Sequence, residues 1–454
     1  MIQTKNYPNG MRLIVETNPD SLASECYFSF DVGALNEKEN ERGYAHMLEH
    51  MLAVESSNRR SATELNKLFA NCGVEPDAAT SYNVTYYAFY SLNESFEKCF
   101  SAFSERIFDC SFDKAELARE QKIILQEHGD GDACPPLENL ALHLHFSGNV
   151  PIAIEGDQKD IKSITIEGLK EFYKREYTPS NLTISIYGNQ TFEEVESLLD
   201  KYVFCYVDKN KYIESPKRPE LPMPTENNFL ILDNNSIQSN VLMIFPQANK
   251  NNYAAQNLII EMLNDYSGLL YEKLRVEEGL VYHVEADFDD QVNSFYIGFE
   301  CSQKDISKCL KKIRKIFENI SKTGVPSETL TSAIAKTQLS LILSSDSDKA
   351  EINAYCQDSD QHKSFEQILS DYRNVTQEQI KTIAKNILNS KFMITAQGKG
   401  IREEQLHCFD KSEYREKFSQ YKNLKHLKKS IKSGGSEKEN APINSKIEQK
   451  TIEK

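Results

Sequence analysis

The chain has 454 residues, more than one ordinary hydrophobic core accommodates, so we expect about two to four domains. Its hydrophobic share of 39% and charged share of 27% are typical of a soluble globular protein, and no run approaches the ~18 apolar residues of a membrane-spanning helix. The net charge of -15 disfavours a nucleic-acid partner. Ten cysteines without a C-x-x-C pair, and an N-terminus without a signal sequence, predict a cytoplasmic protein with reduced thiols.

Apolar periodicity and capping signals predict the elements of the first half. The predicted strands are residues 11–16, 25–33, 81–91 and 181–187. The predicted helices are residues 43–52, about 94–109, 113–128 and 165–176, with two more that begin near residues 61 and 191. Ser61, followed three residues later by Glu64, forms a capping-box pattern at the start of its helix. From Leu140 to the helix at 165 we expect an irregular segment.

The pattern of the first half recurs after a linker in which four prolines between residues 216 and 224 interrupt regular structure. Residues 84–100 recur at 294–310, and residues 165–189 recur at 376–399, so two blocks keep their order and nearly the same offset. This implies a duplicated α+β unit. We predict homologous domains at 1–210 and 228–415 that face each other across a cleft, with a linker at 211–227 and a charged, disordered tail at 416–454.

The stretch Gly43–Leu52 contains an H-x-x-E-H motif in an apolar run of good helix formers. On a helix, His46 and His50 lie one turn apart on one face, so both imidazoles can bind one metal ion, with Glu49 beside them. This is the H-E-x-x-H pattern of zinc proteases in the reverse chain direction. Catalytic zinc also needs a third ligand and a carboxylate that accepts a proton from water, a role that suits Glu49. The alternative is a surface or core histidine pair.

A second acidic helix is the place to seek the third ligand. Glu120 and Glu127 are seven residues apart, hence two turns apart on one face of the helix at 113–128. A solvated acidic face is the alternative. In the second copy, Ala333 and Ser340 align with these two positions, and the H-x-x-E-H motif is missing as well. The histidine pair and the carboxylate pair are thus present together in one half and absent together from the other, as expected for ligands of one ion.

With 76 residues between His50 and Glu127, the chain resembles the pitrilysin family of inverted-motif zinc peptidases, in particular the short branch that includes mitochondrial processing peptidase and its bacterial relatives. The resemblance covers nearly all of residues 1–415. It implies one zinc ion per chain, held by His46, His50 and Glu127. It further implies that Glu49 is the general base and that Glu120 supports the site from the same helix face as Glu127.

A second signature of the family lies in the half without the metal motif. Residues 274–282 resemble its L-R-x-x-x-G-L-x-Y segment, which implies that Arg275 and Tyr282 reach the substrate and the oxyanion formed at the scissile carbonyl. The resemblance also implies that Asp77, Ala78 and Ala79 bind the peptide backbone as part of an edge strand.

The chain departs from the family pattern at three places. Asp77 stands where the family usually has Asn, which removes an amide donor and adds a negative charge near the ion. The family's segment of small residues and Thr after the motif is here 53–57, with Glu55 at its centre, and Leu35 replaces the Arg that usually precedes the motif. The sequence shows no glycine-rich loop like that of the family's noncatalytic processing subunit, so we do not predict cleavage of presequences.

The resemblance implies a zinc-dependent endopeptidase that cleaves peptides or small unfolded polypeptides. From the net charge and the hydropathy we expect no nucleic-acid or membrane partner. One chain carries both the metal motif and the Arg275/Tyr282 segment, so it can act alone or, as we favour, as a homodimer. The alternative is a structural or chaperone-like subunit, because relatives that lost the metal residues serve in assemblies on the same scaffold. A carrier that binds peptides without cutting them is a third possibility.

Overall fold

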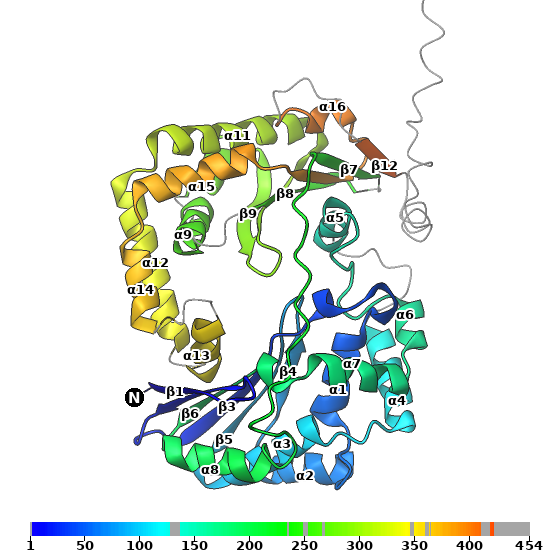
Figure 1. Cartoon of the computed structure of the whole chain (residues 1–454). Helices are drawn as coiled ribbons and strands as arrows, with labels where there is room; N and C mark the ends of the chain where they lie inside the picture. The colour runs from blue at the N-terminus through cyan, green and yellow to red at the C-terminus, as the bar shows by residue number, and fades with distance from the viewer. Residues whose placement is uncertain are drawn as a thin grey trace, which may run out of the picture.

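The computed structural model describes residues 2–127, 137–233, 236–247, 253–265, 268–345, 349–358, 363, 365–409 and 418–421. These residues form two halves, each built on a six-stranded sheet with helices packed against it (Figure 1). The arrangement confirms the predicted α+β class. Within the described ranges, no helix is both long enough and apolar enough to cross a bilayer.

The first sheet has the strand order β1-β2-β6-β3-β5-β4. Its neighbours pair antiparallel, except that β2 and β6 are parallel. The strands are β1 Ile2–Asn6, β2 Arg12–Thr17, β3 Ala23–Phe30, β4 Asp77–Thr80, β5 Thr85–Leu92 and β6 Leu182–Gly188. The helices of this part of the chain are α1 Tyr44–Val54, α2 Ala62–Asn71, α3 Phe96–Phe108, α4 Lys114–Glu127, α5 Leu137–His145, α6 Gln158–Ser163, α7 Ile166–Glu176 and α8 Phe192–Tyr202.

The second sheet has the order β12-β7-β11-β8-β10-β9. Its strands are β7 Asn228–Asp233, β8 Gln238–Pro246, β9 Val281–Asp289, β10 Ser294–Ser302, β11 Met393–Gly398 and β12 Phe418–Tyr421. Its helices are α9 Tyr253–Asn264, α10 Leu269–Tyr271, α11 Ile306–Thr323, α12 Ser327–Ser345, α13 Lys349–Asp358, α14 Phe365–Arg373, α15 Gln377–Asn389 and α16 Glu403–Leu406. A π-helical turn, Glu272–Val276, follows α10.

The two sheets share five strand positions, which bears the duplication out. The series β2-β6-β3-β5-β4 in the first half corresponds to β7-β11-β8-β10-β9 in the second, with one parallel pair at the same place in each series. The sixth strand differs, because β1 pairs antiparallel with β2 whereas β12 pairs parallel with β7. Strand β12 falls in the range predicted to be a disordered tail, and the other residues of that range lie outside the described residues.

Each half lends one helix to the sheet of the other. Helix α5, from the first half, packs on β8 and β11, and Leu140 and Phe146 join the apolar cluster on that sheet. Helix α13, from the second half, packs on β2, β3 and β6, where Ala350 and Ala354 are buried (Figure 1). These helices follow α4 and α12, so the exchange is reciprocal. It ties the two halves together through their sheets.

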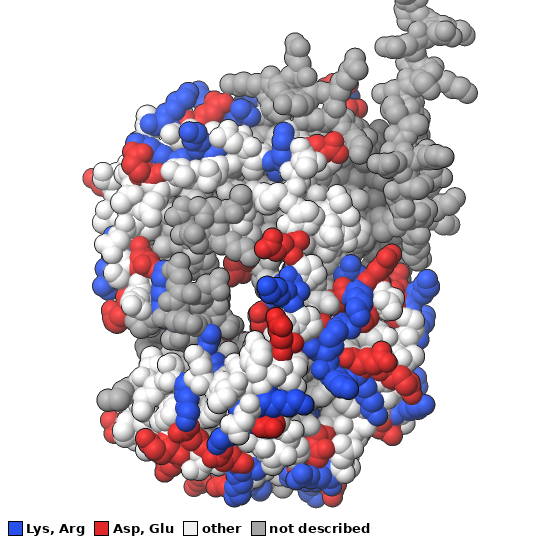
Figure 2. Space-filling model, viewed as in Figure 1, with Lys and Arg blue, Asp and Glu red and all other residues white. Residues whose placement is uncertain are grey.

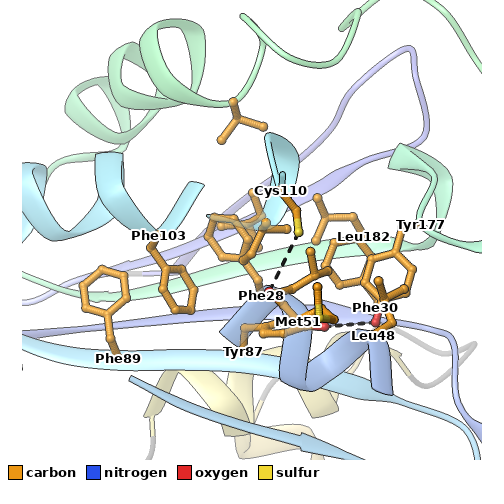
Figure 3. Packing of buried hydrophobic residues seen from close by; sticks show 14 of the residues in the cluster. Phe28, Phe30, Leu48, Met51, Tyr87, Phe89, Phe103, Cys110, Tyr177 and Leu182 are labelled. Atoms are coloured by element: carbon orange, nitrogen blue, oxygen red, sulfur yellow. Dashed lines mark hydrogen bonds between the residues drawn. The ribbon is translucent and has the colours of Figure 1, made fainter. Parts of the chain in front are cut away.

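The core of the first half lies between its sheet and α1, α3 and α7. Leu48 and Met51 of α1 point toward the sheet, where Phe28 and Phe30 of β3 meet them (Figure 3). The Sγ of Cys110 also lies 3.8 Å from the carbonyl oxygen of Met51. Because this packing uses one face of α1, the opposite face is free to carry polar side chains.

Most predicted elements of the first half are present within a few residues of their expected bounds, including the capping box of Ser61 and Glu64. The predicted irregular segment after Leu140 is wrong, since α5 and α6 lie between residues 137 and 163. Strand β1 was not predicted either. Residues 211–227 contain no regular element, as expected for the linker.

Candidate metal centre

The motif helix α1 begins at a close contact that only glycine allows. Gly43 has a φ of 84°, and a Cβ at this position would lie 2.3 Å from the carbonyl oxygen of Glu155. After this turn, α1 buries Met47, Leu48 and Met51 against the core. His46, Glu49 and His50 of the motif therefore gather on the other side of the helix.

The three polar residues of the motif form a tight group. One ligand atom each from His46, Glu49 and His50 lies within 4.8 Å of the others, and the two imidazole centroids are 4.7 Å apart. The Oγ1 of Thr80, in β4, donates a hydrogen bond of 3.4 Å to Glu49 Oε2. In the part of the chain that the structure describes, this is the only cluster of three or more His, Cys, Asp or Glu side chains close enough to hold a metal ion.

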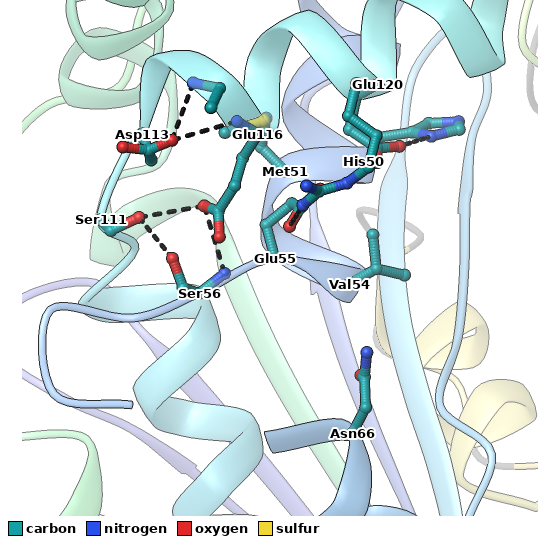
Figure 4. Close-up of polar contacts among 12 residues, drawn as sticks. His50, Met51, Val54, Glu55, Ser56, Asn66, Ser111, Asp113, Glu116 and Glu120 are labelled. Atoms are coloured by element: carbon teal, nitrogen blue, oxygen red, sulfur yellow. Dashed lines mark hydrogen bonds and ion pairs between the residues drawn. The ribbon is translucent and has the colours of Figure 1, made fainter. Parts of the chain in front are cut away.

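Helix α4 brings two carboxylates, Glu120 and Glu127, to the same imidazole. His50 Nδ1 lies 2.9 Å from Glu120 Oε2, and His50 Nε2 lies 3.5 Å from Glu127 Oε2 (Figure 4 shows the first contact). Glu120 is buried with 3% of its side chain exposed, whereas the Glu127 side chain is 50% exposed. Glu120 thus orients His50 from the protein side, and Glu127 approaches its other nitrogen from the solvent side.

Burial and charge set the protonation of these groups. Burial, together with the nearby His50, lowers the pKa of His46 to about 4, so its imidazole is neutral at pH 7. Burial raises the pKa of Glu49 to about 7, although the charge of His50 opposes this shift. Burial also acts to lower the pKa of His50, but the hydrogen bond to Glu120 and the charges of Glu49 and Glu127 outweigh it, and the net shift is upward.

Two residues near the group were not identified as site residues from the sequence. Thr80 contacts Glu49 through the fold of β4 over α1, and nothing in the local sequence indicates this contact. Glu55 was noted only as a departure from the family pattern. Its side chain is 2% exposed and paired with Arg119, and burial together with the neighbouring Glu120 raises its pKa to about 7. Glu55 is therefore a second carboxyl behind the Glu120–His50 pair.

The residues predicted to bind peptide backbone lie beside this group. Asp77, Ala78 and Ala79 form most of β4, which is the last strand of the first sheet and pairs only with β5 among the described strands. Asp77 is exposed, and its Oδ2 accepts a hydrogen bond of 3.0 Å from the hydroxyl of Tyr86. The outer edge of β4 thus has backbone groups available for another strand, next to Glu49.

Arg275 and Tyr282 meet each other in the second half. Arg275 lies in the π-helical turn, and its guanidinium carbon is 5.2 Å from the centroid of the Tyr282 ring. Arg275 also donates hydrogen bonds to the carbonyl oxygens of Val281 and Tyr282. The Tyr282 side chain projects from β9, and 69% of it is exposed. The structure thus places Tyr282 on the edge strand β9 and Arg275 beside it, and β9 takes the position of β4 in the second sheet.

The donor set fits a zinc ion. Two imidazoles and one carboxylate are a known ligand set of catalytic zinc, which keeps a further coordination position open. His46 is neutral, as a ligand must be, and its Nδ1 is buried with no hydrogen-bond partner in the described part of the chain. An imidazole that protein groups leave unsatisfied is costly unless a metal or water completes its contacts. The hydrogen bond from His50 to Glu120 is the carboxylate–histidine arrangement that orients a zinc ligand.

Two sequence profiles match successive ranges of the chain. The profile described as "Insulinase (Peptidase family M16)" matches residues 12–149, and the one described as "Peptidase M16 inactive domain" matches residues 163–337. The chain belongs to peptidase family M16. This is the family of inverted-motif zinc peptidases, also called the pitrilysin family, that the sequence resembles.

Relatives of this M16 chain carry protease names. A Bacillus subtilis protein named "Uncharacterized zinc protease YmxG" is 22% identical over 411 residues, which cover 87% of this chain and 97% of that protein. The probable mitochondrial-processing peptidase subunit beta of Schizosaccharomyces pombe is 28% identical over 205 residues, 44% of each chain. These names indicate that the family uses zinc and hydrolyses peptides.

Solved structures share the fold. A peptidase M16 inactive domain from Pseudomonas fluorescens superposes with a TM-score of 0.77 at 19% identity and covers 88% of this chain and 98% of its own. A putative M16-like peptidase from Alicyclobacillus acidocaldarius gives a TM-score of 0.71 at 20% identity and covers 87% of this chain and 98% of its own. At these identities the likeness establishes the two-half architecture of the M16 chain.

Proposed function

We propose that this M16 chain is a zinc-dependent endopeptidase that cleaves peptides or small unfolded polypeptides. The observation that carries the proposal is the position of the His50 imidazole. One of its nitrogens contacts Glu120 and the other faces Glu127, while His46 and Glu49 lie within 4.8 Å of it on the same helix. His46, His50 and Glu127 would hold the ion. When bound, zinc supplies Lewis acidity, which lowers the pKa of a water molecule and polarises a carbonyl group.

Glu49 is suited to move the proton in this reaction. Its carboxylate is buried beside the histidines, and its raised pKa, about 7, is close to the operating pH, where a general base is most effective. In the proposal, Glu49 accepts a proton from the attacking water and passes it to the leaving amine. Thr80 holds Glu49 Oε2 in place during both transfers.

Peptide binding is proposed to use the free edge of β4. An extended substrate that pairs with Ala78 and Ala79 gains backbone hydrogen bonds, which depend little on its sequence. Arg275 and Tyr282 would then stabilise the negative charge that develops on the scissile carbonyl oxygen. The exposed Tyr282 ring and the neighbouring guanidinium are chemically suited to this task.

The substitution Glu49→Gln tests the proposal. The amide keeps the shape of the side chain but cannot accept the proton, so turnover of a peptide mixture should fall by about 10²–10⁴-fold, the usual contribution of general-base catalysis. Zinc binding should persist, because Glu49 is not one of the proposed ligands. Product formation is measured by mass spectrometry and zinc content by atomic absorption. Wild-type rates in this variant would contradict the role of Glu49.

The profile that matches residues 163–337 is described as inactive, which keeps a non-catalytic subunit as the second candidate. Residues 163–337 do not include His46, Glu49, His50 or Glu127, which all lie in the range 12–149 that the other profile matches. A metal assay separates the two candidates. A zinc content near one ion per chain supports the peptidase, and a purified chain that takes up no zinc supports the structural subunit.

A further inference from the structure

Both ends of the motif helix α1 are held by buried ionisable side chains of other elements. The helix has no side-chain cap of its own, because its N-cap residue is Gly43 and the side chain of its C-cap residue, Glu55, makes no capping bond. The first N–H groups and the last carbonyl groups of a helix have no partners within the helix. At the start of α1, Glu37 accepts hydrogen bonds from two backbone N–H groups, and at the end Arg106 donates to three backbone carbonyl groups.

Glu37 lies in the loop that leads into α1, and only 7% of it is exposed. Its Oε2 accepts a hydrogen bond of 3.1 Å from the N–H of Gly43, and its Oε1 accepts one of 2.9 Å from the N–H of Ala45. One carboxyl group thus replaces the missing N-cap side chain. Ala45 is adjacent to His46, so this contact fixes the backbone directly before the first histidine.

Arg106 comes from α3 and is 2% exposed. Its guanidinium donates hydrogen bonds to the carbonyl oxygens of Ala53 at 2.7 Å, Val54 at 3.2 Å and Glu55 at 3.3 Å. It also bonds to the Oδ1 of Asn66 in α2, and its central carbon is 5.2 Å from the centroid of the Phe69 ring. The last turn of α1 is therefore joined to both α2 and α3 through one side chain.

The two groups stabilise the ends of α1 in different ways. The C-terminus of a helix carries a partial negative charge, so the guanidinium at the end of α1 is favourable. Burial raises the pKa of Glu37 to about 8, so at pH 7 its carboxyl acts at the start of α1 mainly as a hydrogen-bond acceptor. Burying ionisable groups is nevertheless expensive, and apolar residues often give equal or better stability. A buried Glu and a buried Arg at opposite ends of α1 therefore indicate that the position of this helix must be tightly fixed.

The duplicated half supports a link with the metal site. Residues 96–100 of α3 align with 306–310 of α11 at an offset of 210, which places Ile316 of α11 at the position of Arg106. Ile316 is an apolar residue packed on the core of the second half. The half that lacks the ligand set therefore also lacks the guanidinium at this position.

We propose that Glu37 and Arg106 are positioning residues of the metal site, which clamp α1 at its two ends so that His46, Glu49 and His50 are held in place relative to α4. This inference rests on the proposed function, since it concerns the same site. Neither residue touches the substrate or the ion in this account. Both act through the backbone of α1.

The test compares Arg106→Met and Glu37→Gln with the wild-type chain and with a matched control, Arg60→Met. Arg60 is another partly buried arginine, and it forms an ion pair with the buried Glu105 of α3. Among the described contacts it has no hydrogen bond to an α1 carbonyl. Zinc affinity is measured by competition with a chelating dye. The Co²⁺-substituted proteins give absorption spectra that report the ligand geometry, and thermal unfolding of the metal-free proteins reports stability alone.

We expect Arg106→Met and Glu37→Gln to weaken zinc binding by about 10–100-fold, the range found for residues that orient metal ligands, and to alter the Co²⁺ spectrum. Arg60→Met should leave both unchanged even where it lowers the unfolding temperature. Should Arg106→Met fail to fold, Arg106→Lys retains the charge but reaches fewer carbonyls, and it should give an intermediate loss of affinity.

Two different failures can be told apart. If the wild-type chain binds zinc and Co²⁺, but the Arg106 and Glu37 variants show the wild-type affinity and spectrum, the clamp is contradicted and the proposed function stands. The clamp is also contradicted if Arg60→Met weakens zinc binding as much as Arg106→Met does. If the wild-type chain binds neither metal, the proposed function fails and the clamp has no site to position.

Discussion

The two halves of this M16 chain keep the same fold at the helix pair α4 and α12 but not the same chemistry. Glu120 of α4 is buried and Glu127 is exposed, and their aligned residues in α12, Ala333 and Ser340, are buried and exposed in the same way. The duplicated scaffold has thus preserved which positions face the core. It has carboxylates at those positions in one half only, so burial and side-chain chemistry vary independently at the same positions.

The same contrast holds between α1 and α9. Both helices bury apolar residues against their own sheet, Leu48 and Met51 in α1 and Leu258 and Met262 in α9. Only α1 also carries a cluster of His and Glu side chains on its other face. Charged residues on the face of the molecule shown in Figure 2 include both signs, interspersed over the two halves. The two helices therefore differ in the side chains on their polar face and not in the packing of their apolar face.

Glu127→Gln should have the largest effect, because it gives α4 an uncharged side chain at a position where α12 also has one. Removing a proposed ligand should cost more zinc affinity than the ~10–100-fold lost with residues that only orient ligands, and peptide cleavage should disappear with the metal. The matched control is Ser340→Ala at the aligned position of α12, for which we expect no change. Isothermal titration with zinc and a peptide assay measure both effects. Full zinc affinity in Glu127→Gln would exclude this residue as a ligand.

Arg275→Met tests whether the second half contributes to the reaction. Loss of a donor to the developing oxyanion should lower kcat by about 10²–10³-fold while zinc affinity stays at the wild-type value. Lys273→Met is the matched control, because Lys273 lies in the same turn and pairs only with the surface residue Glu277 among the described contacts. Steady-state kinetics separate the two variants. Equal effects of both substitutions would contradict a specific role of Arg275.

Glu120→Gln should give a smaller loss, about 10–100-fold in zinc affinity. Glu120 raises the pKa of His50, and protons compete with zinc for this nitrogen base. In the variant the pKa of His50 falls, so the pH below which the zinc affinity declines from its own maximum should move to a lower value. Zinc titrations between about pH 5 and 8 measure this shift. A pH dependence identical to that of the wild type would show that Glu120 does not control His50.

His145→Gln concerns the contact between the halves and has the smallest expected effect on zinc binding and peptide cleavage. His145 of α5 is 2% exposed, its Nε2 donates to the carbonyl oxygen of Lys391 at 3.3 Å, and its Nδ1 accepts from Asn228 at 3.2 Å. Burial lowers its pKa from 6.5 to about 4, so the neutral form stabilises the fold above pH 6.5, and this stability is lost as the pH falls toward 4.

This difference in the pKa of His145 lowers the free energy of unfolding by about 3 kcal/mol as the pH falls across that range. The glutamine variant cannot take up this proton, so its free energy of unfolding should fall less between pH 7 and pH 4.5 than that of the wild type. Denaturant unfolding at the two pH values measures the difference. Parallel losses in both proteins would show that His145 does not titrate in the folded state.

The parts of the site that follow from helix periodicity could be predicted from the sequence. The four-residue spacing of His46 and His50 and the seven-residue spacing of Glu120 and Glu127 each define one helix face, and the contacts of His50 with both carboxylates fit those faces. The duplication was also visible, because two blocks repeat at one offset. These features depend only on local order along the chain.

Contacts between distant segments could not be predicted in this way. Nothing near Thr80 or Arg106 in the sequence indicates that each reaches α1, since these contacts arise only when β4 and α3 pack against it. The reciprocal exchange of α5 and α13 was missed for the same reason. An amphipathic helix shows that it needs an apolar partner, but its sequence does not identify which sheet provides one.

Anomalous diffraction at the zinc edge, from crystals grown with zinc, tests the central claim most directly. The account predicts one strong peak per chain, within coordination distance of His46, His50 and Glu127, and no peak between α9 and α12 of the second half. Absence of a peak beside the two histidines in crystals that contain zinc elsewhere would contradict the metal centre and the proposed peptidase with it.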